Sequence, residues 1–529
     1  MSPYAKVGGL GDVSASLSAA LKKLGHDVRV VIPRYRCIVI EKYGAAPALN
    51  SMGVWMGDKE EWCMVYQTES AGKVPVYFVE HSVFFDREGL YHDNNMFDYD
   101  DNPRRFAFFS RAALQLCKDI GFKPDIVHGN DWQTALVSAY LKVWHWNDPL
   151  LGGAASLLTI HNAAYQGIYP KSNYDYIGLG WQNFTEAVLE SYDKVNFLKG
   201  GIHFADMVAA VSPTFAKEIC EPGGGFGLAP YLSAKGSKFK GILNGIDYEE
   251  WDPQTDKHLP ARYSVNELDG KKKCKRHLQK IFCLKNDPKT ALIGTVGRFV
   301  DQKGFHLIRN IIESVLDNMH VQFVILGSGE NNLQEFFRDL PARYSGSAGS
   351  YIGFHSEYAH LIEAGCDLFL MPSLFEPCGL NQMYSLRYGT LPIVRATGGL
   401  DDTVENYDEA TGSGCGFKFW ESSENALYYT IGWAVSTYYD RPAHIRKMML
   451  NGMKRDFSWE TSAEKYVDAY TAAIENKREI DSYTPYYSAG NEKKPKAVQN
   501  RISPSETKIM KRDKNHAGFI DNDSIHVLR

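Results

Sequence analysis

The strongest constraint on the fold is an alternation of short strand-like runs with longer amphipathic stretches along most of the chain. Strands are expected at Val28–Ile32, Val74–Val79, Asp125–His128, Ser156–His161, Met207–Val211, Lys240–Leu243, Leu292–Val296, Val321–Leu326, Tyr351–Phe354, Leu368–Met371 and Leu391–Arg395. Helices are expected at Ser14–Leu24, Arg105–Lys118, Trp132–Val143, Phe305–Leu316 and Asn381–Tyr388. This alternation predicts an α/β protein whose parallel sheets carry helices on both faces.

The alternation is interrupted between about residues 245 and 288, and a new series begins at Ala291. We therefore predict two doubly wound domains, residues 1–244 and 245–478, the second with terminal helices that could cross back to the first. A basic run at 271–276 lies between the two series, and we interpret it as the solvated face of a helix rather than an anion-binding patch. From residue 479 to 529 the sequence is polar and has no sustained period, so a disordered tail is expected.

Composition excludes several classes of partner. A net charge of −5 over 529 residues does not predict a nucleic-acid-binding surface. Since no apolar run reaches the length of about 20 residues that a membrane span needs, no membrane partner is expected either. The nine cysteines show neither CxxC pairs nor zinc spacing, which indicates a reduced, metal-free, cytoplasmic protein. A plastid location is the alternative if a transit segment is missing from this chain.

Polar residues follow five of the expected strands, where ligands bind in open α/β sheets. The segments are Asn130-Asp131-Trp132, His161-Asn162-Ala163-Ala164-Tyr165, Arg298 to Gly304, Glu376 to Leu380 and Thr397-Gly398-Gly399. Arg298 and Lys303 could direct two cations at a diphosphate. A solvated pair is the ordinary interpretation of such residues, but the surrounding glycines and the position after a strand favour the diphosphate here. Glu376 could accept sugar hydroxyls or cap a helix. Together the five segments predict a ligand site at the carboxyl ends of the strands.

The other polar and aromatic candidates each have a structural alternative. His161 could support a cationic sugar carbon in a cleft or could be a core histidine. Tyr165 and Trp132 could stack on sugar rings or belong to the core. Cys378 has no evident histidine partner, so we interpret it as a packing or pocket-wall residue rather than a nucleophile.

A glycine-rich loop, Lys6-Val7-Gly8-Gly9-Leu10-Gly11-Asp12-Val13, begins only five residues into the chain. Its composition is typical of a phosphate cradle, but such cradles usually follow a strand.

Seven motifs together resemble those of bacterial glycogen synthases and plant-type starch synthases, in the family's order. They are KVGGLGDV (6–13), HGNDW (128–132), IHNAAYQG (160–167), LNGIDYEEWDP (243–253), GRFVDQKG (297–304), FEPCGLNQMYSLRYG (375–389) and RATGGLDDTV (395–404). The resemblance implies a GT-B fold, with two Rossmann-like domains facing a cleft. It also implies retaining transfer of glucose from ADP-glucose to the nonreducing 4-hydroxyl of an α-1,4-glucan primer such as glycogen, starch or a maltooligosaccharide.

The resemblance also assigns the residues of the site. The family's catalytic positions correspond to His161, Glu376, Arg298 and Lys303. Its ADP-glucose positions correspond to Lys6, Gly8, Gly9, Asp12, Asn162, Asn244, Phe354, Cys378, Gly379, Leu380 and Gly399. Acceptor binding is expected at Asp131, Trp132 and Tyr165. No metal or other cofactor is expected, because Lys6, Arg298 and Lys303 would stabilise the leaving-group charge.

The chain departs from the family pattern in two places, and three other functions remain open. The apolar strand that usually precedes the lysine motif is missing, and Asn130 occupies the second polar position of the HGNDW element. Another GT-B transferase that uses UDP-glucose or makes sucrose is one alternative, and a glucan-binding scaffold without activity is another. A dinucleotide oxidoreductase is the third, but Gly327-Ser-Gly329 is only a fragment of the required glycine motif.

Overall fold

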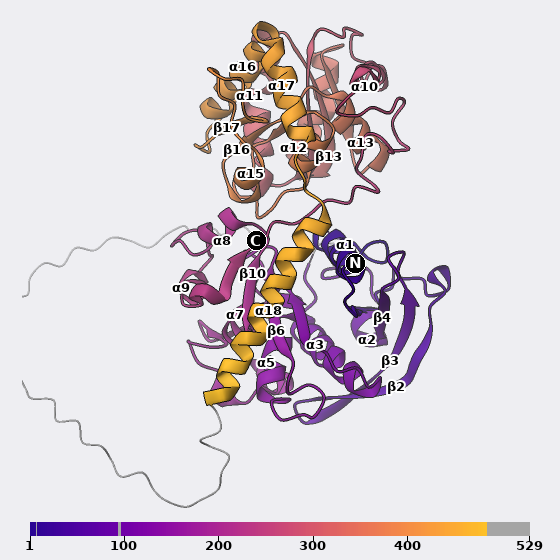
Figure 1. Cartoon of the computed structure of the whole chain (residues 1–529), viewed down its shortest axis with the longest axis vertical. Coiled ribbons are helices and arrows are strands. Elements are labelled where there is room, and N and C mark those ends of the chain that lie inside the picture. The colour runs from indigo at the N-terminus through magenta and orange to yellow at the C-terminus, as the bar shows by residue number, and fades with distance from the viewer. Residues whose placement is uncertain (7, 94–96, 484–529) are drawn as a thin grey trace, which may run out of the picture. The chain divides into compact units, whose positions relative to one another are not determined.

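The computed structural model of the chain describes residues 1–6, 8–93 and 97–483, and Met1–Ile480 form one compact unit. This unit contains two α/β lobes, which Figure 1 shows in indigo to magenta and in pink to orange. The predicted α/β class with parallel sheets is confirmed. Among the described residues, no helix is both long and apolar enough to cross a bilayer.

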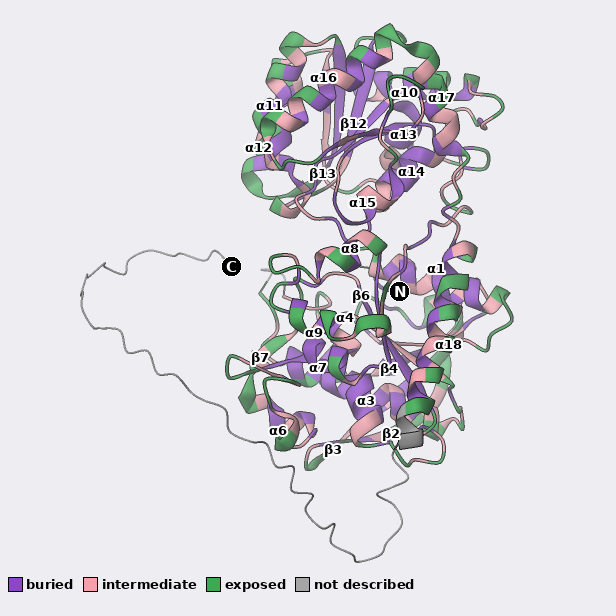
Figure 2. Cartoon of the chain, turned by 60° about the vertical axis from the view of Figure 1, so that its left-hand side comes forward, coloured by how far each residue is buried: buried purple, intermediate pink, exposed green. Residues whose placement is uncertain are grey.

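The second lobe is built on a six-stranded parallel sheet of order β14-β13-β12-β15-β16-β17. Its strands are β12 (Ala291–Phe299), β13 (Val321–Gly329), β14 (Ala348–Ile352), β15 (Leu368–Met371), β16 (Leu391–Arg395) and β17 (Phe417–Phe419). Its helices are α10 (Asp269–Ile281), α11 (Phe305–Asn318), α12 (Asn331–Arg343), α13 (Ser356–Gly365), α14 (Asn381–Arg387), α15 (Gly398–Thr403), α16 (Glu424–Asp440) and α17 (Pro442–Met453). In Figure 2 the buried residues concentrate in strands such as β12, between helices whose outer faces are exposed.

The first lobe contains two four-stranded sheets, ordered β1-β4-β3-β2 and β11-β10-β6-β5, and the small sheet β7-β9-β8. The strands are β1 (Val30–Pro33), β2 (Ala46–Met56), β3 (Lys59–Glu69), β4 (Pro75–Glu80), β5 (Ile126–Asn130), β6 (Ala155–Ile160), β7 (Ile168–Pro170), β8 (Glu190–Ser191), β9 (Lys194–Asn196), β10 (Met207–Ala210) and β11 (Phe239–Gly241). Its helices are α1 (Leu10–Lys23), α2 (Ser82–Phe85), α3 (Asn102–Asp119), α4 (Asp131–Thr134), α5 (Leu136–Val143), α6 (Tyr174–Ile177), α7 (Phe197–Phe204), α8 (Pro213–Glu218) and α9 (Ala229–Ser233).

The long carboxy-terminal helix α18 (Trp459–Tyr483) packs in the core of the first lobe. Trp459 and Tyr466 join the apolar cluster that contains Val13 and Leu17 of α1 and Ala155 of β6. Because α18 follows the second lobe in sequence, the chain crosses between the lobes twice. The helix includes residues 479–483 of the expected tail, and residues 484–529 lie outside the described residues.

Several expected elements differ in the structure. The antiparallel hairpin of β2 and β3 was not predicted. The strand expected at Tyr351–Phe354 is β14, which ends at Ile352, and the helix expected at Trp132–Val143 is divided into α4 and α5. Among the described residues before Lys6 there is no strand, and Ser2 to Tyr4 form a turn.

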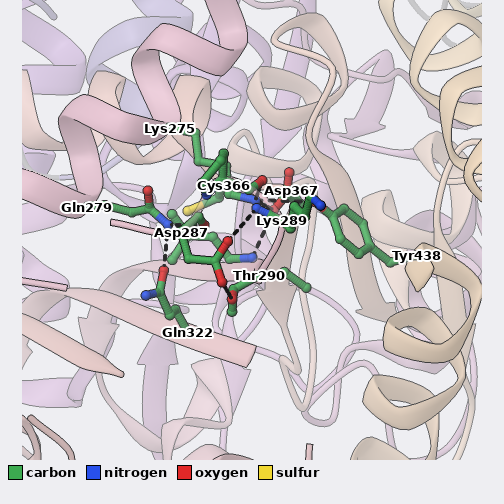
Figure 3. Close-up of polar contacts among 12 residues, drawn as sticks. Lys275, Gln279, Asp287, Lys289, Thr290, Gln322, Cys366, Asp367 and Tyr438 are labelled. Carbon is green, nitrogen blue, oxygen red and sulfur yellow. Dashed lines mark hydrogen bonds and ion pairs between the residues drawn. The ribbon is translucent and has the colours of Figure 1, made fainter. Parts of the chain in front are cut away.

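The interpretation of residues 271–276 as a solvated helix face holds for Lys272, Lys273 and Arg276, which are exposed, but is wrong for the other two lysines. These residues lie on α10, but Lys271 and Lys275 are buried, with 6% and 5% exposure. The helical period puts both lysines on the inner face with Cys274 and Leu278. Figure 3 shows Lys275 among polar groups of the second lobe: its Nζ lies 2.6 Å from Asp367 Oδ2, which also accepts a hydrogen bond from Leu292 N at 2.8 Å. A buried ammonium is tolerated here because it is paired.

Replacing Asp367 with alanine is therefore expected to lower the free energy of unfolding by about 3–5 kcal/mol, because Lys275 would remain buried without its counter-charge. Urea unfolding followed by circular dichroism measures this loss. The matched control is Asp269→Ala, which breaks the exposed pair with Lys272 on the same helix and should leave the unfolding midpoint nearly unchanged. Equal midpoints for the two variants would contradict the prediction.

Candidate active site

Lys303 and Glu376 form the central ion pair of the second-lobe site. Lys303 ends a short turn after β12, and Glu376 follows β15, so the two neighbouring parallel strands bring them to the same edge of the sheet. The distance from Lys303 Nζ to Glu376 Oε2 is 2.5 Å, and Ser373 Oγ donates to the same oxygen at 3.0 Å. Glu376 is only 5% exposed, so its carboxylate is fixed before a ligand arrives.

Glycines allow the loops around Glu376 to pack closely. Gly304 has a φ of +68°, and a Cβ there would lie 2.1 Å from Pro372 O. A Cβ on Gly399 would lie 2.0 Å from Cys378 O, and Gly399 N donates to Glu376 O at 3.1 Å. The structure therefore gives Gly399 a packing role beneath the Glu376 loop.

Arg395 also holds this loop, and the sequence did not single it out. Its Nε donates to Ser373 O at 2.9 Å, and its Nη2 donates to Leu374 O. It is one residue of the RATGG motif, so its position was visible in the sequence but its partners were not. The backbone from Ser373 to Leu380 is thus positioned from two sides.

Cys378 is buried in the core cluster of the first lobe, with 6% exposure. Burial raises the pKa of its thiol to about 12, so the sulfur is protonated at neutral pH and is a poor nucleophile. Asn244 hydrogen-bonds to this cysteine, and its own buried Oδ1 has no hydrogen-bond partner among the described residues. Gly379, with a φ of +72°, and Leu380 follow and lead into α14.

Arg298 and Phe354 remain open to solvent at the ends of β12 and β14. Arg298 is exposed, and among the described residues its guanidinium makes no ion pair or hydrogen bond. Phe354 is 89% exposed. Both side chains are therefore accessible to a ligand from solvent.

In the first lobe, Asp131 and His161 form a second group at the ends of β5 and β6. Asp131 has a φ of +54°, an uncommon conformation that directs its side chain at the next strand end. Its Oδ1 accepts hydrogen bonds from His161 N at 2.7 Å and Asn162 N at 3.4 Å. The Asn162 side chain accepts from Ala164 N at 3.0 Å and so shapes the turn after β6.

The imidazole of His161 is neutral at physiological pH, because burial lowers its pKa to about 4. Its Nε2 lies 3.0 Å from Asn130 Oδ1. A neutral ring fits the sequence hypothesis of a group that supports, rather than repels, a developing positive charge. Asn130 was noted only as a departure from the family pattern, and the structure makes it the partner of His161.

Burial raises the pKa of Asp131 to about 7, against the opposing hydrogen bonds from His161 N and Asn162 N. Because the folded pKa is raised, the stability linked to this group is complete below about pH 4 and is lost as the pH rises to about 7. We expect Asp131→Asn to remove that loss. Between about pH 4 and 7, the free energy of unfolding of the variant should therefore increase relative to that of the wild type by up to about 1.4 kcal/mol per pH unit. Urea unfolding at pH 4.5, 6 and 7.5 tests it, with Asp193→Asn as the exposed control. A difference independent of pH would contradict the prediction.

The two aromatic acceptor candidates differ in exposure. Tyr165 is 60% exposed and available to a sugar ring. Trp132 is 7% exposed and packs against Phe106, Tyr169 and Phe197. The structure therefore favours the core alternative for Trp132, because its ring faces are covered.

The glycine-rich loop lies beside the second-lobe site. Lys6 Nζ pairs with Asp12 Oδ1 at 2.8 Å, and both side chains are partly exposed. A Cβ on Gly9 would lie 3.9 Å from Leu380 Cδ1, and Gly8 has a φ of +78°. Lys6 is thus held by its own loop and is close to the residues that lead into α14.

Hydrogen bonds also join the two lobes beside this site, and the sequence gave no signal for them. Thr214 donates from its backbone nitrogen and its hydroxyl to Asp402, at 2.9 and 2.8 Å. Glu218 Oε1 accepts from Thr397 Oγ1 at 2.9 Å and from Gly398 N at 3.0 Å.

The predicted site residues fall into two groups in the structure. One cluster contains Lys303, Glu376, Cys378 and Asn244. The other contains Asp131, His161 and Asn162.

Comparison with known proteins identifies the family of this chain. Residues 1–234 match the model of the starch synthase catalytic domain, and residues 279–431 match that of the glycosyl transferases group 1. Glycogen synthase 1 of Geobacter sulfurreducens is 47% identical over 474 residues, covering 89% of this chain and 94% of that protein. Glycogen synthase of Anaeromyxobacter sp. is 46% identical, covering 89% and 97%.

Solved structures agree with the sequence comparison. The catalytic domain of starch synthase IV from Arabidopsis thaliana, bound to ADP and acarbose, matches with a TM-score of 0.82 and 36% identity, covering 90% of this chain and 98% of that one. A sucrose-phosphate synthase from Thermosynechococcus elongatus, at 16% identity and a TM-score of 0.53, shares the fold alone. The chain belongs to the glycogen synthase and starch synthase family of GT-B glucosyltransferases.

Proposed function

We propose that the protein transfers glucose from ADP-glucose to the nonreducing 4-hydroxyl end of an α-1,4-glucan, with retention at the anomeric carbon. The observation that carries the proposal is the buried Glu376, paired with Lys303 at the sheet edge where Arg298 also ends its strand. A fixed carboxylate suits sugar hydroxyls, and two permanent cations suit a diphosphate. The catalytic domain of starch synthase IV from Arabidopsis thaliana is bound to ADP and acarbose, which supports a nucleotide donor and a glucan acceptor.

The residues of the site would act by positioning and by electrostatic stabilisation. Arg298, Lys303 and Lys6 would stabilise the negative charge that grows on the departing diphosphate. Glu376 would hold the donor glucose, and the neutral His161 would tolerate positive charge on the sugar carbon. With Cys378 protonated, front-face transfer fits best: the bond from the anomeric carbon to the diphosphate oxygen breaks as the acceptor oxygen bonds to the same face. The acceptor proton would pass to the departing phosphate.

We propose that this chemistry needs no metal ion, since Arg298, Lys303 and Lys6 would supply the positive charge. We also propose that the enzyme works in the cytoplasm. Transfer should therefore continue at full rate when EDTA is added. A rate that falls with EDTA and recovers with Mg²⁺ would contradict the first point.

The decisive experiment supplies radiolabelled ADP-glucose or UDP-glucose to the purified protein with glycogen or maltooligosaccharides. We expect ADP-glucose to be preferred and the labelled product to be released by an enzyme specific for α-1,4 links. Transfer from UDP-glucose alone, or only to a small sugar, would support the other GT-B activity. Glycogen binding without transfer would support the scaffold alternative.

A further inference from the structure

The loop that carries Glu376 is held from both of the strands that flank it in the second-lobe sheet. This loop follows β15, which lies between β12 and β16. On one side, Gln302 lies in the short turn after β12. On the other side, Arg395 is the last residue of β16. Both side chains donate hydrogen bonds to the backbone of the loop, and neither is among the site residues that the sequence predicts.

All four successive backbone carbonyls from Ser373 to Glu376 accept a hydrogen bond from another segment. In order along the loop, the donors are Arg395 Nε at 2.9 Å, Arg395 Nη2, Gln302 Nε2 at 3.3 Å and Gly399 N at 3.1 Å. The carbonyl of Gln302 in turn accepts a hydrogen bond from Leu374 N at 2.8 Å. Because satisfied polar networks are rigid, these bonds restrict the backbone conformation of the loop.

The direction of the Glu376 carboxylate depends on this backbone. The carboxylate accepts a hydrogen bond from Ser373 Oγ, but Ser373 belongs to the same loop and moves with it. Its ion pair with Lys303 comes from outside the loop, but the flexible stem of a lysine can follow a carboxylate that moves. The side chains of Gln302 and Arg395 form what we call the backbone clamp, because they fix the main chain from which the carboxylate extends.

Gln302 supplies its hydrogen bond without adding charge to the site. A side-chain amide donates to a carbonyl and carries no charge at physiological pH. The next residue, Lys303, pairs with Glu376 at 2.5 Å. A carboxylate at position 302 would add a negative charge beside this pair, and a lysine would add a positive one. Gln302 thus holds the loop without disturbing the ion pair.

We propose that Gln302 and Arg395 are positioning residues for glucosyl transfer: they fix the loop so that the Glu376 carboxylate meets the donor glucose in the direction that the reaction needs. The inference rests on the proposed function, in which Glu376 holds that glucose. Both residues act through Glu376 and not on the substrate. A misplacement of about 1 Å can lower a rate by about 10²-fold, so loosening the backbone clamp should be visible in kcat.

The test compares kcat of the wild type and of Gln302→Met with ADP-glucose and glycogen. Methionine keeps the length of the side chain but has no group that donates to Phe375 O. We expect kcat to fall by about 10- to 10²-fold. In a Glu376→Ala background the same substitution should change kcat by less than about twofold, because a residue that acts only through Glu376 has nothing left to position.

Two variants of Arg395 give a graded second measurement. A lysine keeps the charge and can donate to one of the two loop carbonyls, so Arg395→Lys should retain more of the wild-type kcat than Arg395→Met.

The matched control is Asn451→Leu in α17, a helix that carries none of the predicted site residues. Asn451 is half-buried, and its amide also donates to a backbone carbonyl, that of Gly414 at 3.0 Å. This control should leave kcat unchanged.

Hydrogen exchange followed by mass spectrometry measures the loop without any transfer reaction. The amides of Leu374 to Glu376 should exchange about tenfold or more faster in Gln302→Met than in the wild type. In Asn451→Leu they should exchange at the wild-type rate.

Three results would overturn the proposal: a wild-type kcat in Gln302→Met, an equal loss of kcat with and without Glu376, or unchanged exchange in the loop. If any of them came from an active wild type, the positioning role alone would be wrong. If the wild type itself transferred no glucose, the proposed function would be wrong, and the positioning role would fail with it.

Discussion

Replacing Glu376 with alanine is expected to reduce kcat for glucosyl transfer by about 10²–10³-fold. The carboxylate is buried, receives hydrogen bonds from Lys303 and Ser373, and lies on a loop held by Gly399 and Arg395. Its removal takes away a preorganised acceptor and leaves the Lys303 charge without its partner. Losses of one preorganised group at an active site are typically of this size, about 2.7–4 kcal/mol. Initial rates with ADP-glucose and glycogen measure the effect.

Two further variants serve as comparisons for this experiment. Glu376→Gln keeps the shape of the side chain and one acceptor oxygen but removes the charge, so it tests how far the charge itself is needed. Glu313→Ala removes an exposed carboxylate that pairs with Arg343 in the same lobe, and its rate should equal that of the wild type. If Glu376→Ala kept a tenth or more of the wild-type kcat, Glu376 would have no catalytic role.

Much of the second-lobe site could be predicted because each residue follows a strand directly. Lys303 and Glu376 are 73 residues apart in sequence, yet parallel strands place their carboxyl ends at one edge of the sheet. The expected strands at 292–296 and 368–371 therefore put both side chains at that edge, but the sequence did not predict that β12 and β15 are neighbours, on which the contact depends. The same reasoning placed Asp131 near His161, at the ends of β5 and β6.

Other features depend on tertiary packing, which a local sequence pattern does not predict. Trp132 follows a strand like the other site residues, but aromatic side chains from α3, β7 and α7 enclose it. Lys271 and Lys275 have the composition of a solvated face, and only acceptors from distant segments, such as Asp367 and Thr390, make their burial tolerable. The hairpin of β2 and β3 mixes charged and apolar residues along two long strands, and its partner strand β4 decides which face is buried.

Lys303→Ala should produce the second large loss, about 10²-fold or more in kcat. The ammonium has two tasks in the proposed mechanism: it holds Glu376 through the 2.5 Å contact, and it stabilises the departing diphosphate. Lys303→Arg keeps the charge and should recover part of the rate. Lys272→Ala is the matched control, because this lysine is largely exposed in its pair with Asp269 and should not affect transfer.

The double variant Lys303→Ala/Glu376→Ala shows whether the pair acts as one unit. Residues in contact couple, so the two losses should not add, and the double variant should be less than about tenfold slower than the worse single variant. Each single variant leaves one member of the pair without its counter-charge, whereas the double variant removes both members, and this limits the further loss. If instead the two losses multiplied, Lys303 would act on the diphosphate and Glu376 on the sugar independently, and the contact between them would be incidental to catalysis.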